Sequence, residues 1–156
     1  MYKNEFDNYL KQNKKFKSYM FYGQSIFLVE QYSLAIAQSF GENDEIEKLY
    51  FEDYNFKYAK DKLLQSSLFS SNNILLIKVE KKLPKKEVDT LIEACNANPD
   101  STLIFACLGD GDFKTMESSF SLKTNSAAVR FFQPTDTEAI RFLEYEAKFL
   151  EMQYEI

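Results

Sequence analysis

Five short apolar runs recur along the chain, separated by longer segments whose apolar residues repeat at helical spacing. Short apolar runs bounded by turn residues are typical of buried strands, whereas spacings of three and four predict helices with one apolar face. The predicted strands cover residues 18–22, 47–51, 74–79, 102–108 and 127–132. The predicted helices cover residues 1–13, 25–40, 58–64 and 84–97, and a further helix begins after residue 135. Because strands alternate with helices, we expect an α/β domain of three layers, in which helices cover both faces of a mostly parallel five-stranded sheet.

The end of the chain has a pattern of its own. Gln133 and Pro134 break the fifth predicted strand, and a capping box runs from Thr135 to Glu138. The helix that follows has a wide apolar face, which includes Ile140, Leu143, Ala147, Leu150 and Tyr154. A face of this width needs a partner to cover it. We therefore predict one domain over residues 1–134 and the start of a second, helical domain over residues 135–156, truncated within its first helix.

Composition and charge narrow the class of protein. The chain has 156 residues, of which 45% are hydrophobic, and its fifteen Phe and ten Tyr predict an aromatic core. The net charge of −5 argues against a free-standing nucleic-acid binder, whose surface would be basic. Lysines concentrate in residues 1–20 and 78–86, where a solvated surface is the favoured interpretation.

Neither a metal site nor a membrane segment is expected. Cys95 and Cys107 lack the CxxC spacing, and the chain contains no His. Both observations argue against a zinc site. Both cysteines fall on predicted apolar faces, so we expect small core residues in a reducing cytoplasm. No signal peptide opens the chain, and no apolar run approaches the length of a membrane span.

The order strand, glycine, helix at Gly23-Gln24-Ser25 is the place to look for a phosphate-binding loop. Such a loop needs a second glycine, a lysine for the outer phosphates and a hydroxyl for magnesium. Here bulky residues follow at once, and neither the lysine nor a hydroxyl at the right offset is present. The third predicted strand ends in Lys78-Val79-Glu80, without the acidic pair that would hold magnesium. We therefore expect a degenerate phosphate loop and no bound cofactor, although these residues taken alone favour an ordinary strand–helix turn.

The stretch Gln65-Ser66-Ser67-Leu68-Phe69 places two large apolar side chains on a polar link between a helix and a strand. Composition alone favours a core contact for Leu68 and Phe69, since most apolar residues near the ends of elements are buried. The alternative is an exposed pair that inserts into another protein.

The amino-acid sequence of this stretch resembles the short peptide by which many bacterial replication proteins dock on the sliding clamp. The consensus is Gln, an aliphatic residue, Ser or Asp, Leu and Phe. The chain matches it at Gln65, Ser67, Leu68 and Phe69 and departs from it at Ser66. Together with the order of elements, the degenerate phosphate loop and the break before the last helix, the chain resembles the N-terminal portion of the delta subunit of the bacterial DNA polymerase III clamp loader.

This resemblance implies a P-loop NTPase-like domain of the AAA+ (RecA-like) class that does not bind ATP. It implies a subunit that is not itself an enzyme, grips the beta sliding clamp and opens the ring for loading onto primed DNA. By resemblance, Leu68 and Phe69 enter an apolar pocket on the clamp, with Gln65 hydrogen-bonding beside it and Ser67 completing the motif. The implied partners are the clamp and the other loader subunits, with primed DNA only within the assembled complex. Two rival functions stay open from the residues: a nucleotide-dependent α/β enzyme, and an adaptor for another protein in which Leu68 and Phe69 belong to the core.

Overall fold

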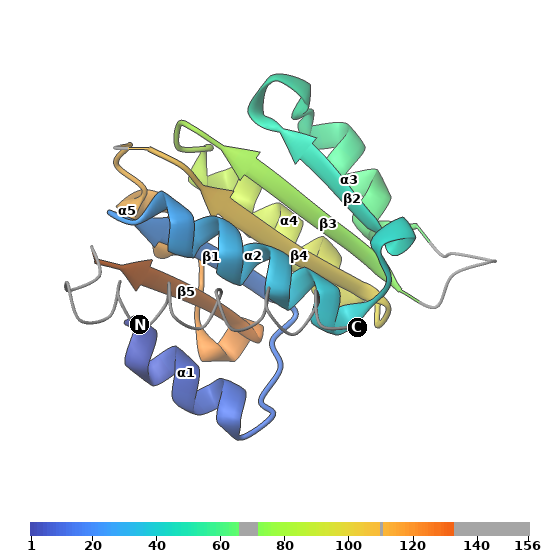
Figure 1. The fold of residues 1–156 in the computed structure, drawn as a ribbon. Coiled ribbons are helices and arrows are strands. Elements are labelled where there is room, and N and C mark those ends of the chain that lie inside the picture. The colour runs from blue at the N-terminus through green and yellow to red at the C-terminus, as the bar shows by residue number, and fades with distance from the viewer. Residues whose placement is uncertain (66–71, 110, 133–156) are drawn as a thin grey trace, which may run out of the picture.

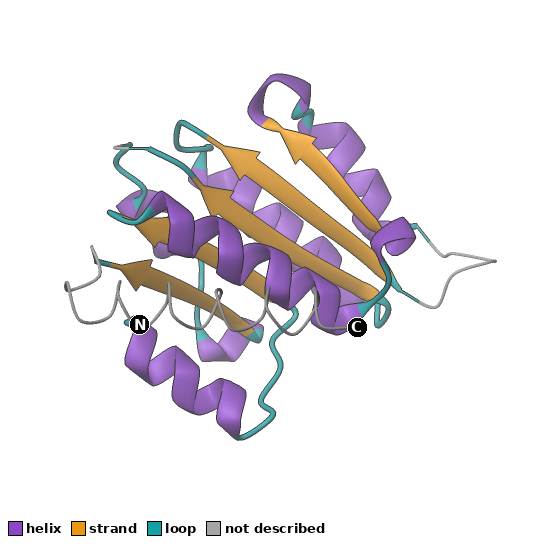
Figure 2. Ribbon diagram, viewed as in Figure 1, coloured by secondary structure: helices purple, strands orange, loops and turns teal. Residues whose placement is uncertain are grey.

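The structure is a computed structural model, and it describes residues 1–65, 72–109 and 111–132. Within these residues helices and strands alternate along the chain (Figures 1 and 2). The strands are β1 Ser18–Gly23, β2 Ile46–Tyr50, β3 Asn73–Val79, β4 Ser101–Cys107 and β5 Ser126–Phe131. The α-helices are α1 Lys3–Lys11, α2 Ile26–Phe40, α3 Phe56–Leu64, α4 Lys85–Ala97 and α5 Lys114–Glu117. Single 3₁₀ turns occupy Asn43–Glu45, Phe51–Asp53 and Leu122–Thr124.

The five strands form one sheet in the order β2-β3-β4-β1-β5. Every neighbouring pair among these strands is parallel, which confirms and sharpens the expectation of a mostly parallel sheet. Strands β3 and β4 lie in the middle and are almost wholly buried, as continuous apolar runs in a parallel sheet should be. The register places Asn73 opposite Ser101 and Ser18 opposite Ser126, so polar residues mark the starts of four strands.

Helices cover both faces of the sheet and make three layers (Figures 1 and 2). On one face, α1 and α2 pack over an aromatic cluster. Its rings belong to Phe6, Phe16, Tyr19, Phe21, Tyr32 and Phe131. On the other face, α3, α4 and α5 enclose a second core of mainly aliphatic residues, including Leu63, Leu91 and Met116. The aromatic core expected from composition therefore lies mainly on one side of the sheet.

Local differences from the sequence prediction have physical causes. Asn73 belongs to β3 rather than to the preceding turn, because its amide pairs with the Asp100 carbonyl at 2.9 Å. Pro84 lies at the N-cap of α4 instead of in its first turn. Ile26 fits the apolar spacing of the predicted helix over residues 25–40 but is 50% exposed, whereas Leu28 and Val29 are buried. The predicted second domain over residues 135–156, and the break before it at Gln133 and Pro134, lie outside the described residues.

Candidate functional site

The two candidate sites lie at opposite ends of the parallel strands. We call the side where the strands end the carboxyl edge, and the side where they begin the amino edge. Gly23-Gln24-Ser25 follows β1 at the carboxyl ends of the parallel strands, whereas Gln65 precedes β3 at the amino ends. A strand of seven residues such as β3 spans about 20 Å. Gln65 and the predicted phosphate loop therefore lie far apart, at opposite ends of the strands.

At the carboxyl edge, backbone amides of the predicted phosphate loop form hydrogen bonds with other groups of the protein. Gly23 has a φ of +131°, and the Gln24 amide donates to the Phe131 carbonyl at 2.9 Å. The Ser25 hydroxyl caps α2 by accepting from the Leu28 amide at 3.2 Å. A phosphate cradle needs such amides to point at the ligand. Two of the backbone amides at this turn, those of Gln24 and Leu28, are engaged within the protein, and the degenerate phosphate loop stays a prediction.

A small hollow of about 200 Å³ lies beside this loop, and Gln24, Gly109, Lys114 and Arg130 contribute to its lining. Open α/β sheets bind ligands at this edge. At the neighbouring end of β3, Lys78 pairs with Glu30 at 3.5 Å and lies over the Tyr50 ring, where an active ATPase would place its acidic pair. Residues 1–65, 72–109 and 111–132 contain no group of three His, Cys, Asp or Glu side chains suited to a metal ion.

At the amino edge, Gln65 is the one residue of the predicted clamp-binding motif that falls among the described residues. It is exposed and extended at the C-terminus of α3, with its amide donating to the Lys62 carbonyl at 3.3 Å. Ser67, Leu68 and Phe69 lie outside the described residues, and their roles remain predictions. Beside Gln65, an open hollow of about 470 Å³ runs along the exposed side of α3, with Leu64 45% exposed at its border.

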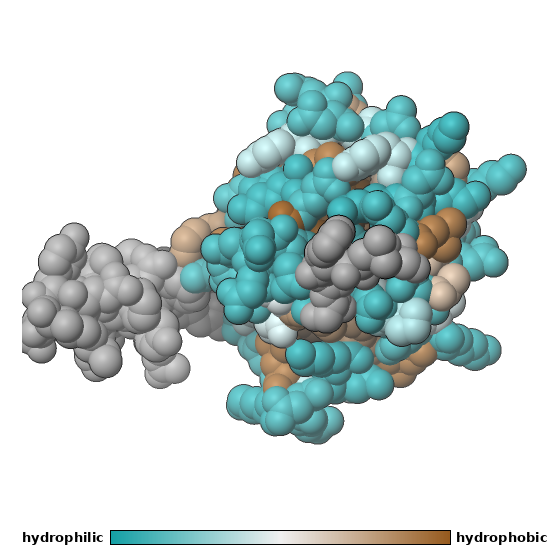
Figure 3. Space-filling model, turned by 90° about the vertical axis from the view of Figure 1, so that its right-hand side faces the viewer, coloured by the Kyte–Doolittle hydropathy of each residue, from teal (hydrophilic) through white to brown (hydrophobic). Residues whose placement is uncertain are grey.

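The surface around this edge is mostly hydrophilic (Figure 3). Hydrophobic residues form only small, separate areas on the described part of this face (Figure 3). The described residues therefore offer no broad apolar interface on this face, and docking here would depend on a few large side chains.

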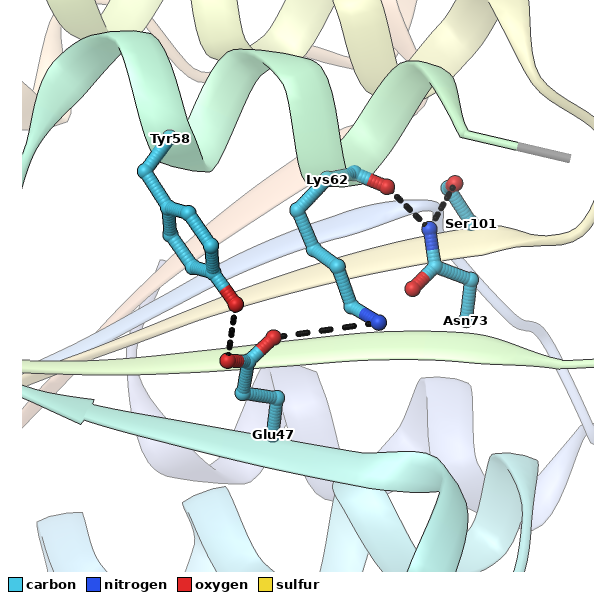
Figure 4. Close-up of polar contacts among 5 residues, drawn as sticks. All are labelled: Glu47, Tyr58, Lys62, Asn73 and Ser101. Atoms are coloured by element: carbon cyan, nitrogen blue, oxygen red, sulfur yellow. Dashed lines mark hydrogen bonds and ion pairs between the residues drawn. The ribbon is translucent and has the colours of Figure 1, made fainter. Parts of the chain in front are cut away.

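Polar side chains hold the C-terminus of α3, and Figure 4 shows Asn73 and Ser101 among them. The side-chain amide of Asn73 donates to the Lys62 carbonyl at 2.5 Å and to the Ser101 hydroxyl at 3.1 Å. The Ser101 hydroxyl in turn donates to the Leu63 carbonyl at 2.6 Å. The Asn98 side chain donates to the carbonyls of Leu63 at 3.0 Å and Gln65 at 3.1 Å. We call Asn73, Asn98 and Ser101 the carbonyl cap, because together they bind the carbonyl groups at the end of this helix.

The exposed side of α3 is joined to β2 as well. Glu47 on β2 accepts a hydrogen bond from the Tyr58 hydroxyl and lies 3.7 Å from the Lys62 ammonium group (Figure 4). The hydrogen bond to Glu47 raises the pKa of Tyr58, since deprotonation would place two negative charges side by side. Helix α3 is thus fixed along its length to β2 and at its end to β3 and β4.

Sequence reasoning missed the carbonyl cap. The predicted strands begin at residues 74 and 102, just after Asn73 and Ser101, and the predicted helix over residues 84–97 ends just before Asn98. A further surprise is Lys17, which belongs to a run interpreted as solvated. Its ammonium group donates to the carbonyls of Asn98, Pro99 and Ser101 at 2.7, 3.2 and 2.8 Å. The only signal in the sequence is a polar residue at the start of an apolar strand.

Both cysteines are buried, as expected. Cys95 is on α4 and Cys107 ends β4, and both are free thiols. Burial raises the pKa of Cys95 to about 11 and raises that of Cys107 too. Among the described residues, none of the helices combines the length and apolar content needed to cross a bilayer.

The chain belongs to the DNA polymerase III delta subunit family, whose model matches residues 19–132. Its fold matches that of the Bacillus subtilis DNA clamp loader delta protein (YqeN), with a TM-score of 0.63 and 14% sequence identity. This match covers 89% of the chain and 45% of that protein, and it confirms the predicted fold class. The family assignment likewise confirms the resemblance drawn from the sequence.

Two curated relatives come from Helicobacter pylori, strains J99 and 26695. Each is 28% identical to the chain over 97% of its length. The chain spans about half the length of these relatives, since the alignment covers 50% of each.

Proposed function

We propose that this chain is the clamp-binding part of a delta subunit, which grips the beta sliding clamp and opens the ring for loading onto primed DNA. Gln65, Ser67, Leu68 and Phe69 form the docking motif. Leu68 and Phe69 enter an apolar pocket of the clamp, and Gln65 hydrogen-bonds at its rim. Other loader subunits supply the hydrolysis of ATP, and primed DNA is met only within the assembled complex.

The placement of Gln65 carries this proposal. It is exposed at the end of α3, on a sheet edge remote from the degenerate phosphate loop, and the rest of the motif follows it directly. An extended backbone at Gln65, with a ψ of 128°, directs the chain away from the helix axis. Membership of the delta subunit family supports the beta sliding clamp as the partner. In an unrelated α/β protein, the docking motif would have no explanation.

The chain takes no chemical step in this function. Opening the ring is a shift of population: a subunit that binds the open conformation of the clamp more tightly than the closed one favours opening. Such a subunit needs a specific docking surface and no nucleotide of its own. The engaged amides of the phosphate loop support this division of labour and disfavour a nucleotide-dependent enzyme.

A double replacement, Leu68→Ala with Phe69→Ala, tests the proposal. Burying a Leu and a Phe in a partner is worth about 3–6 kcal/mol together, so binding to purified clamp should weaken at least about a hundredfold. The matched control is Ile26→Ala with Phe27→Ala, an apolar pair that is 50% and 51% exposed at the opposite edge. It should leave clamp binding unchanged.

A melting curve separates docking from a core role. If Leu68 and Phe69 belong to the docking surface, the double variant should melt close to the wild type. If they belong to the core, as the adaptor alternative requires, the cavity would cost on the order of 5 kcal/mol of stability. A collapsed melting temperature, or clamp binding that survives intact, would refute the docking motif.

A further inference from the structure

The end of helix α3 lacks the usual means of satisfying its last carbonyl groups. A helix leaves about four carbonyls without partners at its C-terminus, and a glycine in the left-handed region commonly follows to satisfy them. Here Gln65 follows in an extended conformation, with φ −71° and ψ 128°. The carbonyls of Lys62, Leu63 and Gln65 are instead bound by side chains that come from three other elements.

The side chains that bind these carbonyls are themselves held in place. Asn73 and Ser101 are 4% and 1% exposed, pair across β3 and β4, and bind each other as well as α3. Asn98 ends α4 and is half-buried, and its side-chain oxygen accepts from the Asp100 amide at 3.1 Å. Lys17 adds its ammonium group to the carbonyls of the same link between α4 and β4. The groups that hold α3 are therefore themselves fixed by the sheet.

The return of the chain to the sheet is held in the same way. The Asn72 amide donates to one carboxylate oxygen of Glu45 at 3.2 Å, and the Asn73 amide donates to the Asp100 carbonyl at 2.9 Å. Glu45 is in turn held by the Glu42 amide at 2.9 Å. Residues on both sides of the docking motif, Gln65 before it and Asn72 after it, thus have fixed backbone positions.

We infer that Asn73, Asn98 and Ser101 are positioning residues for partner binding: the carbonyl cap sets the point and direction at which the docking motif leaves the domain. This inference rests on the proposed function and adds residues that touch neither the clamp nor the motif's apolar side chains. Its physical basis is preorganisation, because a segment whose stem is fixed beforehand loses less freedom when it binds. The same hydrogen bonds explain why polar residues occupy an otherwise apolar position at the start of β3 and β4.

Two matched pairs of variants test the inference. Asn98→Asp keeps the oxygen that accepts from Asp100 but removes the donor to the carbonyls of Leu63 and Gln65. Its control is Asn96→Asp, which makes the same change of charge and removes a donor to the Thr124 carbonyl at 2.8 Å. Ser101→Ala removes a buried hydroxyl that donates to a helix carbonyl at 2.6 Å. Its control is Ser33→Ala, which removes a buried hydroxyl donating at 2.6 Å to the Val29 carbonyl on the other face of the sheet.

The measurement is the Kd of the 156-residue chain for purified beta clamp, with melting curves for every variant. Asn98→Asp and Ser101→Ala should each weaken binding about tenfold, while their controls change it by less than about twofold at comparable loss of stability. In the background of Leu68→Ala with Phe69→Ala, the cap variants should have no further effect, because there is no docked motif left to position.

The outcomes separate the two proposals. If the wild-type chain does not bind the clamp, the proposed function and this inference both fail. If the wild type binds but each cap variant matches its control, the proposed function stands and the positioning role is wrong. If a cap variant still weakens binding about tenfold without Leu68 and Phe69, its effect does not pass through the docking motif, and the inference is also wrong.

Discussion

Replacing Gly23 by alanine tests why a glycine stands at the end of β1. Gly23 has a φ of +131°, and a Cβ atom there would lie 2.0 Å from the Phe131 carbonyl oxygen and 2.7 Å from the Phe131 nitrogen. Both are backbone atoms of β5, which cannot swing aside as the tip of a side chain can. Strand β5 would have to move away from β1 and lose the hydrogen bond from the Gln24 amide at 2.9 Å. We conclude that packing between these two strands requires the glycine.

The magnitude follows from these contacts. A positive φ at a non-glycine residue costs about 1–3 kcal/mol, and a lost hydrogen bond adds about 1 kcal/mol. With the displacement of β5, Gly23→Ala should lower the free energy of unfolding by about 3–5 kcal/mol. Gly109→Ala is the matched control, because Gly109 also has a positive φ, +102°, but no atom lies within 4 Å of its added Cβ. It should show only the strain of about 1–3 kcal/mol.

Urea denaturation of the two variants and the wild type measures the difference directly. The slopes should agree and the midpoints should fall in the order wild type, Gly109→Ala, Gly23→Ala. Equal losses for the two variants would refute the steric argument and would mean that β5 yields to the added methyl group without cost.

Three further predictions concern ligand binding and titration. Titration with magnesium-ATP should give no heat of binding, since the Gln24 amide is engaged by Phe131 and the loop has no lysine; micromolar affinity would contradict this. A thiol reagent at a pH of about 8 should modify Cys95 and Cys107 only after denaturation, because burial raises the pKa of both thiols, and rapid labelling of the folded chain would be evidence against that burial. Burial raises the pKa of Tyr19 from 10.0 to about 12, so folding favours its neutral form, and stability should be full below a pH of about 10 and decrease as the pH rises from about 10 to 12. Urea midpoints at these pH values check this, with Tyr19→Phe expected to remove part of the loss; a midpoint independent of pH would show the sign to be wrong.

The strands and their parallel pairing could be predicted because the pattern is simple. An apolar run such as residues 74–79 is buried on both faces, and alternation with helices leaves parallel pairing as the simplest arrangement. Helix faces were less certain. Ile26 fits the apolar spacing of α2 but is half exposed, whereas Leu28 and Val29 in the same turn are buried. Helical periodicity predicts which residues share the apolar face of a helix, but it does not predict how much of that face is buried.

The carbonyl cap could not have been predicted. Asn73 lies far from Asn98 and Ser101 in the sequence, and the partners of these residues on α3 are up to 38 residues away. Only the topology, which gathers the amino ends of parallel strands at one edge, brings them together. The docking motif stays a prediction, which the sequence alone can suggest because a short linear motif needs no tertiary contacts to be recognised. Lys17 shows the converse, since a lysine within a charged run has three defined carbonyl partners.

The most direct test of the account is a titration of the wild-type 156-residue chain with purified beta sliding clamp, followed by size-exclusion chromatography of the mixture. We predict saturable binding without nucleotide and a complex that elutes ahead of either protein. Separate elution of the two proteins, with no heat of binding at the highest concentration that both tolerate, would contradict the proposal that this chain docks on the clamp.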